Sequence, residues 1–472
     1  MSLERLVIVG NGMAATRLVE ELVAARYPGA ITVLGDEPGP AYNRILLSAV
    51  LEGTHSLDAL VLRAPEWFAA HGVDLRLGAR VLEIDREAGE AMLVDGTRIG
   101  FDRLVLATGS IPTLPPIRGL VQMDGQLSAK VHAFRSLADC LRLMGAVPSA
   151  ERAVVVGGGL LGLQVARALT VRGLLTEVVE GSEHLLSRQV DEQGGSVLRR
   201  SLRKLGTEVY TGVRAVRLTE DGLKLDNGHV LETDLVVLTA GGRPSTALAR
   251  AAGLFVRRGV VVDHQLASIT DPRIHALGDC AEFGSRTTGF VAPAWEQAGV
   301  LAQVLTAPQS PGAVYSGSRN VARLRATGLD VAVLGDPEQA EGEVVEVTNP
   351  IVGSHRKLVV RGGVVVAGTL IGDLSRVGLI TQLYERGTVL GPAEPGELLL
   401  AERPAGESGP LLPDDAEVCA CAGVSAGRLR ACSSVEEARE TTRATTGCGG
   451  CTSVVKQLVG CATAGAAAGS AG

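Results

Sequence analysis

A strand followed by a glycine-rich turn and a helix occurs twice in this chain and constrains its fold most. In the first copy, residues 5–22, an apolar strand leads into Gly10-x-Gly12-x-x-Ala15 and then an amphipathic helix. The first glycine of such a turn permits the bend, the second lets a pyrophosphate approach, and a small third residue keeps helix and strand close. Free N–H groups at the helix N-terminus favour an anion. This order of elements predicts a dinucleotide-binding fold.

The next strand of the first copy, within residues 30–37, ends in Asp36 and Glu37. An acid at this point is placed to bond the ribose hydroxyls of an adenosine, and it makes the glycine motif far more specific than the motif alone. Asp36 is therefore a predicted ribose ligand.

The second copy covers residues 152–173 and carries Gly157-x-Gly159-x-x-Gly162. Its following strand, residues 174–180, ends in Glu180. A carboxylate accepts hydrogen bonds from a ribose 2′-OH but repels a 2′-phosphate, so NADH is favoured over NADPH. The alternative is that Glu180 is only a solvated strand end. Apolar strands that break at glycine, within residues 104–119 and 235–246, are typical of chain crossings between two nested domains.

Two closely spaced cysteine pairs, Cys419-x-Cys421 and Cys448-x-x-Cys451, offer four thiolates near the C-terminal end. Four thiolates suit zinc or an iron–sulfur cluster, and C-x-C is shorter than the usual spacing of zinc ligands. A [2Fe–2S] cluster therefore fits better than zinc, and two disulfides are a further alternative. The four other cysteines lack such a pattern: we expect Cys140 and Cys280 to be buried thiols, and neither Cys432 nor Cys461 to be a ligand.

The overall charge and composition exclude some partners. The net charge is −7 and aromatic residues make up 3% of the chain, which argues against nucleic acid, since phosphate binding requires a basic face. No apolar run reaches the roughly 18 residues of a membrane span. The first residues run straight into a strand without a signal peptide, so we expect a soluble, cytoplasmic protein that keeps its thiols reduced.

The order of GxGxxA, ATG, GxGxxG and ALGD along the chain resembles the flavoprotein reductases with two dinucleotide-binding domains. Residues 42–53, 133–143 and 157–169 are more similar still to the flavin-binding half of NADH-dependent assimilatory nitrite reductases and to the electron-transfer subunits of assimilatory nitrate reductases. Residues 418–451 resemble the bacterioferritin-associated-ferredoxin-like [2Fe–2S] module of those proteins. Together these resemblances cover most of the chain.

The resemblance implies FAD, NADH and a [2Fe–2S] cluster as cofactors, with no side chain acting as nucleophile or base. The implied FAD-binding residues are Gly10, Gly12, Met13, Ala14, Ala15, Asp36, Arg44, Val81, Thr108, Gly109, Arg135, Asp279 and Val291. NADH would be held by Gly157, Gly159, Gly162 and Glu180. The cluster would be ligated by Cys419, Cys421, Cys448 and Cys451.

The expected fold class is α/β, with two nested Rossmann-like domains, a small α+β domain and a small C-terminal helical module. The expected boundaries are an FAD-binding domain at 1–111 and 240–312, an NAD-binding domain at 112–239, a small α+β domain at 313–400, a flexible linker at 401–416, the [2Fe–2S] module at 417–461 and a disordered tail at 462–472.

The chain also departs from the related reductases. They often carry lysine at the position of Ala49 and glutamate at that of Gln164, near the flavin; here both charges are absent together, so neither is left uncompensated. No cysteine precedes Cys140, which excludes the C-x4-C disulfide chemistry of other members. The sequence ends in small residues after Cys451, without a sirohaem domain, so we expect no nitrite reduction by this chain alone.

The sequence therefore predicts an NADH-oxidising flavoprotein that passes electrons through FAD and a [2Fe–2S] cluster to a separate acceptor. A nitrate reductase catalytic subunit is the favoured acceptor and a nitrite reductase the second. The alternatives are a stand-alone NADH:ferredoxin or rubredoxin reductase and a flavin-based redox-sensing interaction protein. The oligomeric state is open, with a homodimer among the options.

Overall fold

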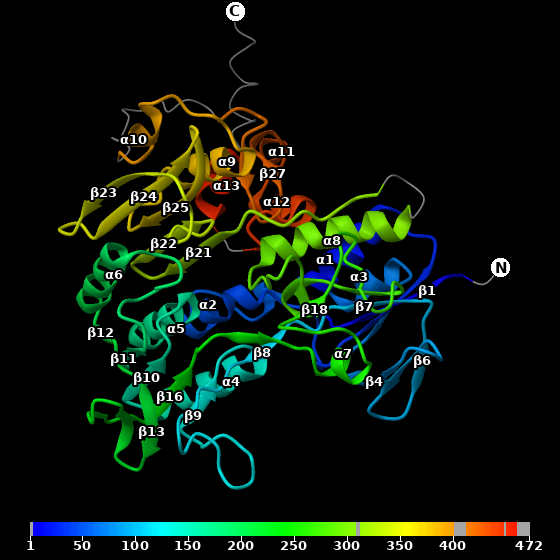
Figure 1. Cartoon of the computed structure of the whole chain (residues 1–472), viewed down its shortest axis with the longest axis horizontal. Coiled ribbons are helices and arrows are strands. Elements are labelled where there is room, and N and C mark those ends of the chain that lie inside the picture. The colour runs from blue at the N-terminus through cyan, green and yellow to red at the C-terminus, as the bar shows by residue number, and fades with distance from the viewer. Residues whose placement is uncertain (1–2, 308–311, 401–411, 448–449, 460–472) are drawn as a thin grey trace, which may run out of the picture. The chain divides into compact units, whose positions relative to one another are not determined.

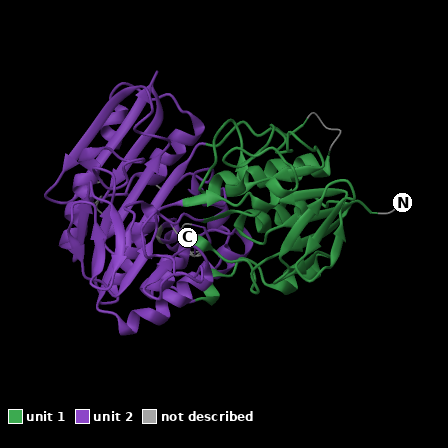
Figure 2. Cartoon of the chain, turned by 60° about the horizontal axis from the view of Figure 1, so that its bottom comes forward, with its two compact units in different colours: residues 1–44, 57–111, 242–318 green, residues 45–56, 112–241, 319–472 purple. Residues whose placement is uncertain are grey.

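The computed structural model describes residues 3–307, 312–400, 412–447 and 450–459. Cys448, Cys461, the predicted tail and residues 401–411 of the predicted linker lie outside these ranges. The chain forms two compact units, coloured separately in Figure 2. Unit 1 comprises residues 1–44, 57–111 and 242–318; unit 2 comprises residues 45–56, 112–241 and 319–472.

Unit 1 is built on a parallel five-stranded sheet in the order β19-β7-β1-β2-β3. Its central strand β1 is almost wholly apolar and buried along Leu6–Val9, as expected for a strand covered on both faces. Helices α1 and α8 pack against each other on this sheet (Figure 1). The bounds are β1 Arg5–Val9, β2 Ala30–Leu34, β3 Asp74–Arg76, β7 Arg103–Leu106, β19 Ile274–Ala276, α1 Met13–Ala24 and α8 Val291–Thr306.

Smaller elements complete unit 1. An antiparallel sheet joins β4 (Val81–Asp85), β5 (Glu90–Leu93) and β6 (Arg98–Gly100), and a short ladder joins β18 (Val260–Val261) to β20 (Ala281–Glu282). Short helices are α3 (Pro65–Ala70) and α7 (Ala247–Ala251). The chain leaves the unit near β8 (Ser110–Pro112) and re-enters it near β17 (Gly242–Pro244).

Unit 2 contains a second parallel sheet, in the order β12-β11-β10-β16-β9. The prediction of an α/β fold with two parallel-sheet, Rossmann-like domains is thereby confirmed. The bounds are β9 Val131–Ala133, β10 Arg152–Val156, β11 Leu175–Glu180, β12 Thr207–Thr211, β16 Leu235–Leu238, α2 Leu47–Glu52, α4 Leu137–Ala146, α5 Leu160–Val171 and α6 Glu192–Lys204. An antiparallel sheet, β13 Ala215–Thr219, β14 Gly222–Leu225 and β15 Val230–Leu231, is attached to it.

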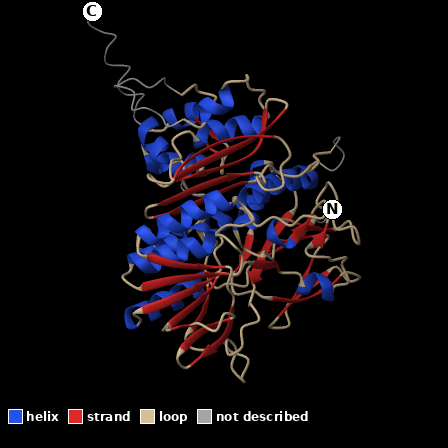
Figure 3. Ribbon diagram, turned by 60° about the vertical axis from the view of Figure 1, so that its left-hand side comes forward, coloured by secondary structure: helices blue, strands red, loops and turns tan. Residues whose placement is uncertain are grey.

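An antiparallel sheet in the order β21-β22-β25-β24-β23 follows within unit 2. Figure 3 shows these sheets in red and their helices in blue. Helix α9 packs on β22 and β25 around Ile380, which is fully buried. The bounds are β21 Val321–Ala326, β22 Leu329–Leu334, β23 Glu343–Asn349, β24 Ser354–Arg361, β25 Val364–Ile371, α9 Val377–Arg386 and α10 Glu394–Leu398.

The C-terminal module is smaller and has its own core, in which Cys419, Cys432 and Cys451 are buried among alanine, valine and leucine. The predicted helical module has its helices, and it also contains a two-stranded antiparallel ladder that was not predicted. The bounds are β26 Glu417–Cys419, β27 Val424–Ser425, α11 Ala426–Arg430, α12 Val435–Thr442 and α13 Thr452–Leu458. At the described end of the predicted linker, residues 412–415 are exposed and Ala416 is 4% exposed; Arg430 donates hydrogen bonds to Leu412 O and Asp414 Oδ1.

None of the helices in the described part of the chain combines the length and apolar character that a membrane crossing requires.

Candidate functional site

The turn after β1 can be formed only by glycine at position 10. Gly10 has a φ of +113°, and a Cβ placed there would lie 2.3 Å from the carbonyl oxygen of Ala107. Its N–H donates to Leu34 O at 2.8 Å, which ties the turn to β2. The bend therefore comes from a backbone conformation and a close approach that side chains exclude.

The N-terminus of α1 is open toward an anion. Its N-cap, Gly12, supplies no side-chain cap, the first turn holds no acid, and a Cβ at Gly12 would meet nothing within 4 Å. Met13 and Ala14 start the helix, and Ala15 is fully buried against the strand. Asn11 Oδ1 is buried and has no hydrogen-bond partner among the described residues. An open helix terminus with an unsatisfied polar atom beside it fits the pyrophosphate of FAD.

The turn after β10 has the same construction. Gly157 has a φ of +119° and a Cβ there would lie 2.7 Å from Thr239 O; a Cβ at Gly162 would lie 1.9 Å from Gly157 O. Gly159, the N-cap of α5, has no side-chain cap, and a Cβ there would meet nothing within 4 Å. We call each glycine turn with its open helix N-terminus a glycine cradle, the first at residues 10–15 and the second at residues 157–162. The second cradle fits the pyrophosphate of a nicotinamide dinucleotide.

The acids that follow each loop are placed differently. Asp36 is exposed two residues beyond the end of β2, whereas Glu37 accepts a 2.9 Å hydrogen bond from Tyr42 and pairs with Arg44. Glu180 ends β11 and accepts N–H bonds from Gly158 at 2.6 Å and Ser182 at 2.7 Å. Glu180 therefore shapes the second glycine loop directly.

Further predicted residues of unit 1 gather at the carboxyl ends of β7 and β19. Thr108 Oγ1 donates to Ser245 O at 2.7 Å, next to Gly109, whose φ is +66°. Asp279 Oδ2 accepts a 2.7 Å bond from Ser110. The other two predicted residues of this unit, Val291 and Val81, are the first residues of α8 and β4.

Gln297, a buried glutamine on α8, was not predicted from the sequence. Its Oε1 accepts the N–H of Gly278 at 2.7 Å, and it is 2% exposed. Gly278 precedes Asp279, so Gln297 fixes the turn that presents this acid. A mostly apolar helix with two amides, Gln297 and Gln303, was the only available sequence signal.

Arg135 lies in unit 2, immediately before α4, and its N–H donates to Asp139 Oδ2 at 3.2 Å. Ser136 and Asp139 form a reciprocal capping box there. Position 135 is thus held by a well-formed helix start.

Ala49 and Gln164, the positions of the missing lysine and glutamate, lie on α2 and α5, which pack against each other in unit 2. Gln164 Nε2 donates to Arg325 O at 3.3 Å. The amide thus bonds a strand carbonyl of the same unit.

The described cysteines of the C-terminal pairs lie on short, well-anchored segments. Cys419 ends β26 and is 3% exposed, Cys421 is half-buried, and Cys451 is 6% exposed at the start of α13. Thr445 N–H donates to Cys451 Sγ at 3.3 Å. Hydrogen bonds of this kind favour the thiolate form that metal binding needs. Cys448 lies outside the described residues.

The isolated cysteines are confirmed as buried. Cys140 and Cys280 are fully buried, their thiols donate to backbone carbonyls, and burial raises the pKa of both, that of Cys140 to about 11. Cys432 donates to Arg428 O at 3.4 Å, within its own helical turn.

Three side chains of unit 2 that could bind a metal, Asp191, Glu346 and His355, lie within 4.8 Å of one another. Lys357 Nζ, however, is 3.0 Å from Asp191 Oδ2, and His355 Nε2 is 3.3 Å from Oδ1. A lysine therefore already neutralises the carboxylate of Asp191, and the ion pairs of Asp191 join the start of α6 to β24.

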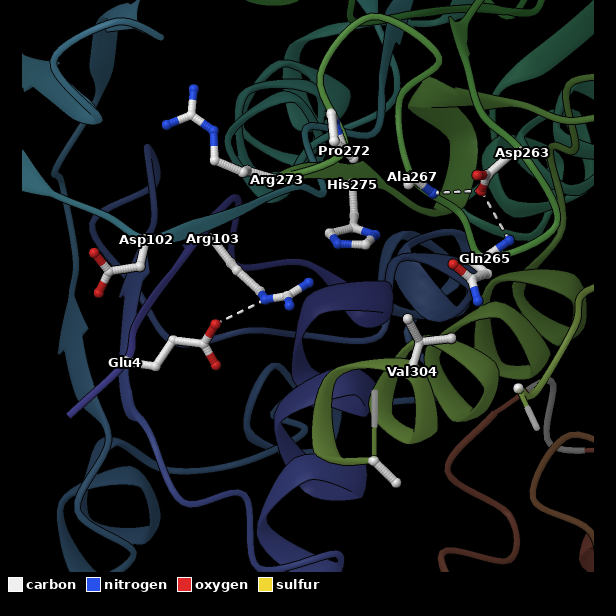
Figure 4. Close-up of a pocket in the computed structure, with 12 residues that line it drawn as sticks. Glu4, Asp102, Arg103, Asp263, Gln265, Ala267, Pro272, Arg273, His275 and Val304 are labelled. Carbon is white, nitrogen blue, oxygen red and sulfur yellow. Dashed lines mark hydrogen bonds and ion pairs between the residues drawn. The ribbon is translucent and has the colours of Figure 1, made fainter. Parts of the chain in front are cut away.

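A cavity of about 400 Å³ opens at the amino ends of β1, β7 and β19 (Figure 4). Arg103 Nε donates to Glu4 Oε1 at 2.8 Å there, and burial together with the charge of Arg103 lowers the pKa of His275 to about 4. Proteins with parallel sheets bind nucleotides at the carboxyl ends of the strands. The cavity lies at the amino ends of the strands, whereas the glycine loop lies at their carboxyl ends. The cavity is therefore not the cofactor site.

Comparison with known proteins agrees with the interpretation of the two glycine loops as dinucleotide-binding sites. Residues 4–303 match the family model described as pyridine nucleotide-disulphide oxidoreductase. The chain belongs to this family. It is therefore an FAD-dependent NAD(P)H oxidoreductase.

Similar proteins extend the likeness beyond the family model. This oxidoreductase is 33% identical to a nitrite reductase [NAD(P)H] of Bacillus subtilis, over 97% of the chain and 58% of that protein. It is 31% identical to the assimilatory nitrate reductase electron transfer subunit of the same organism, over 97% of the chain and 60% of that protein. The chain thus spans less than two thirds of the length of these relatives.

Among solved structures, the oxidoreductase is similar to a ferredoxin reductase from Rhodopseudomonas palustris, with a TM-score of 0.71 and 28% identity. That match covers 78% of this chain and 91% of the other. The covalent putidaredoxin reductase–putidaredoxin complex gives a TM-score of 0.76 and 25% identity over 84% of this chain.

Proposed function

We propose that this protein oxidises NADH and passes the electrons, through FAD and a [2Fe–2S] cluster, to a separate catalytic protein of nitrate or nitrite assimilation. The observation that carries the proposal is the presence of two open glycine cradles of the same construction, followed by a module that buries cysteines from both predicted pairs. The two cradles would bind the two dinucleotides, and the module would hold the cluster from which electrons leave the protein.

In this proposal, unit 1 holds FAD and the second cradle holds NADH. Gly10, Gly12 and the N–H groups of Met13, Ala14 and Ala15 would bind the FAD pyrophosphate, with Asp36 at the ribose and Asp279 at the ribityl chain. Asp279 is kept in place by Ser110 and by the turn that Gln297 fixes. Thr108, Gly109, Arg44, Val81 and Val291 stay proposed contacts of the same cofactor, and the role of Arg135, in unit 2, stays a prediction from the resemblance.

The second cradle favours NADH. Gly157 and Gly159 would accept the pyrophosphate at the N-terminus of α5, and Gly162 lets this helix approach β10 closely. Glu180 carries a negative charge at the loop, which suits a ribose diol and repels a 2′-phosphate. Its two backbone bonds hold the carboxylate at this position.

The chemistry itself would belong to the cofactors: FAD, when bound, would supply hydride acceptance from NADH and one-electron release. The protein would bind and orient each dinucleotide at the N-terminus of a helix, α1 in unit 1 and α5 in unit 2. No side chain is required as nucleophile or base.

The cysteine module offers the thiolate donors that a [2Fe–2S] cluster requires. Cys419, Cys421, Cys448 and Cys451 would be the ligands, and a [2Fe–2S] cluster takes four thiolates. The N–H of Thr445 offsets negative charge on one of them. A cluster that accepts single electrons would connect the flavin to a one-electron acceptor.

The acceptor is proposed from the relatives. Proteins named as a nitrate reductase electron transfer subunit and as nitrite reductases match 97% of this chain. A nitrate reductase catalytic subunit is the first candidate and a nitrite reductase the second. The structural likeness to ferredoxin reductases favours a second candidate function, a stand-alone NADH:ferredoxin or rubredoxin reductase.

Anaerobic reconstitution tests the proposal. The purified protein should show flavin absorption and the broad bands of a [2Fe–2S] cluster, and NADH oxidation should accelerate when a candidate nitrate reductase and nitrate are added. Acceleration only by a ferredoxin or rubredoxin would select the second candidate. NADH oxidation without transfer to any acceptor would favour a redox sensor, and tetrahedral zinc in place of iron would contradict the cluster.

A further inference from the structure

Arg325, on strand β21, connects the cysteine module to the rest of unit 2. Its Nη2 donates a 3.1 Å hydrogen bond to the carbonyl oxygen of Gly450, the residue directly before Cys451. The carbonyl of Arg325 accepts the bond from Gln164 on α5. Three segments far apart in sequence therefore meet at this residue, all within unit 2.

The guanidinium of Arg325 brings a positive charge to the peptide before Cys451, and its ion pair with a carboxylate is long. Its carboxylate neighbour within 4 Å in the described part of the chain is Asp330, whose Oδ1 lies 3.9 Å from Nε, beyond hydrogen-bonding distance. The bond to Gly450 is made to a neutral carbonyl. A charged donor makes such a bond stronger than a neutral one, and the bond places the guanidinium directly against the peptide before Cys451.

We propose that Arg325 is a positioning residue that seats the peptide before Cys451 and raises the reduction potential of the cluster this cysteine ligates. The inference rests on the proposed function, because it requires a [2Fe–2S] cluster. A cluster gains one negative charge on reduction, so a nearby cation stabilises the reduced form and raises its potential.

A second arginine holds the module at another point, which makes Arg325 separable from the docking of the module as a whole. Arg386, at the end of α9, donates to Asp415 O at 3.4 Å, and α9 packs on β26. Loss of the Arg325 side chain therefore leaves these contacts in place.

The test compares three variants of the full-length protein, purified anaerobically. Arg325→Met removes the charge and the bond, and Arg325→Lys keeps the charge. Arg323→Met is the matched control, because Arg323 lies two residues earlier on the same face of β21 and bonds Thr381 instead, at 3.3 Å. Iron content is measured first, and the cluster is then titrated with dithionite and followed by electron paramagnetic resonance. The reductant supplies one electron to each cluster, and no bond is made or broken.

The expected result is a more negative midpoint potential in Arg325→Met, with Arg325→Lys close to the wild type and Arg323→Met unchanged. Loss of iron confined to Arg325→Met would equally support the seating role. A full iron content with the wild-type potential in Arg325→Met would overturn the inference, as would the same loss or shift in Arg323→Met. A wild-type protein without an iron–sulfur signal would instead overturn the proposed function, and this inference with it.

Discussion

Gly10 and Gly12 stand in the same turn but serve different requirements. A side chain at Gly10 collides with the protein itself, at Ala107 O, and φ is in the left-handed region. A side chain at Gly12 meets nothing in the protein. The first glycine is therefore needed for folding of the turn, and the second for access of a ligand.

The two alanine substitutions should separate these roles. Gly10→Ala should lower the free energy of unfolding of the apoprotein by about 2 kcal/mol, as expected for a buried collision with backbone strain. Gly12→Ala should change it by less than about 0.5 kcal/mol and still weaken FAD binding at least about tenfold, because the methyl group occupies the approach of the pyrophosphate. Urea unfolding and fluorescence titration with FAD measure the two effects. Normal FAD affinity in Gly12→Ala would contradict the assignment of this loop.

Glu180 combines a structural and a selective role. Glu180→Arg should raise the NADPH-to-NADH ratio of kcat/KM by about tenfold or more, since a hydrogen bond to a charged group contributes about 1.5–3 kcal/mol. It should also loosen the second loop, because the N–H groups of Gly158 and Ser182 lose their acceptor. Steady-state kinetics with both nucleotides give the ratio. Glu177→Gln, on the same strand and bonded to Tyr210, is the control; an unchanged ratio in Glu180→Arg would remove this residue from nucleotide selection.

At the scale of elements, α6 is joined through Asp191 to the five-stranded antiparallel sheet that contains β24. Burial alone would raise the pKa of this carboxyl, but His355, the N–H of Gly194 and Lys357 lower it well below its usual range. Asp191 also caps α6 through the Gly194 N–H, at 2.8 Å. One residue thus starts the helix and holds it to β24.

Asp191→Asn should be less stable than the wild type by about 2 kcal/mol near neutral pH, because Lys357 loses the nearer of its two charged partners. A lowered pKa in the folded state contributes stability above the unfolded value of 3.8, and this contribution is lost as the pH falls below it. The difference between variant and wild type should therefore shrink between pH 5 and about pH 2. Urea unfolding followed by circular dichroism measures it, with Glu338→Gln, which loses a longer contact to Lys357 of 3.4 Å, as control. A constant difference over this range would exclude the ion pair as its cause.

The sequence predicted the elements that repeat a known local rule, and missed the contacts for which no such rule exists. Both glycine turns follow from residue types and spacing within about twenty positions. The bonds Gln297–Gly278 and Arg325–Gly450 join residues 19 and 125 positions apart, and neither has a local pattern. The ladder β26-β27 was missed for a related reason: it is too short for periodicity to show it, and it is set by the core around Cys419.

The left-handed residues of the cysteine module were equally unpredictable. Arg443 and Thr445 have φ values of 62° and 69°, a conformation that usually selects glycine or asparagine. Their strain is tolerated because the surrounding module fixes them, and Thr445 thereby directs its N–H at Cys451. A tertiary requirement of this kind leaves no signal in residue type.

At the scale of the whole molecule, the proposed route has an entrance and an exit in different modules. The nucleotide cradles belong to the two parallel sheets, whereas the cysteines belong to a module with its own core. If the module serves only as the exit, hydride transfer from NADH should not depend on it.

Cys448→Ser should therefore abolish the [2Fe–2S] absorption and transfer to a protein acceptor, while NADH-to-dye activity stays within about twofold of the wild type, because the cofactor cradles are untouched. Visible spectra, iron content and paired dye and protein-acceptor assays measure this. Cys432→Ser is the matched control: its thiol is buried in the same module but donates to Arg428 O, so it should keep the cluster and both activities. Equal loss of both activities in Cys448→Ser would show that the module stabilises the whole oxidoreductase rather than carrying electrons out of it.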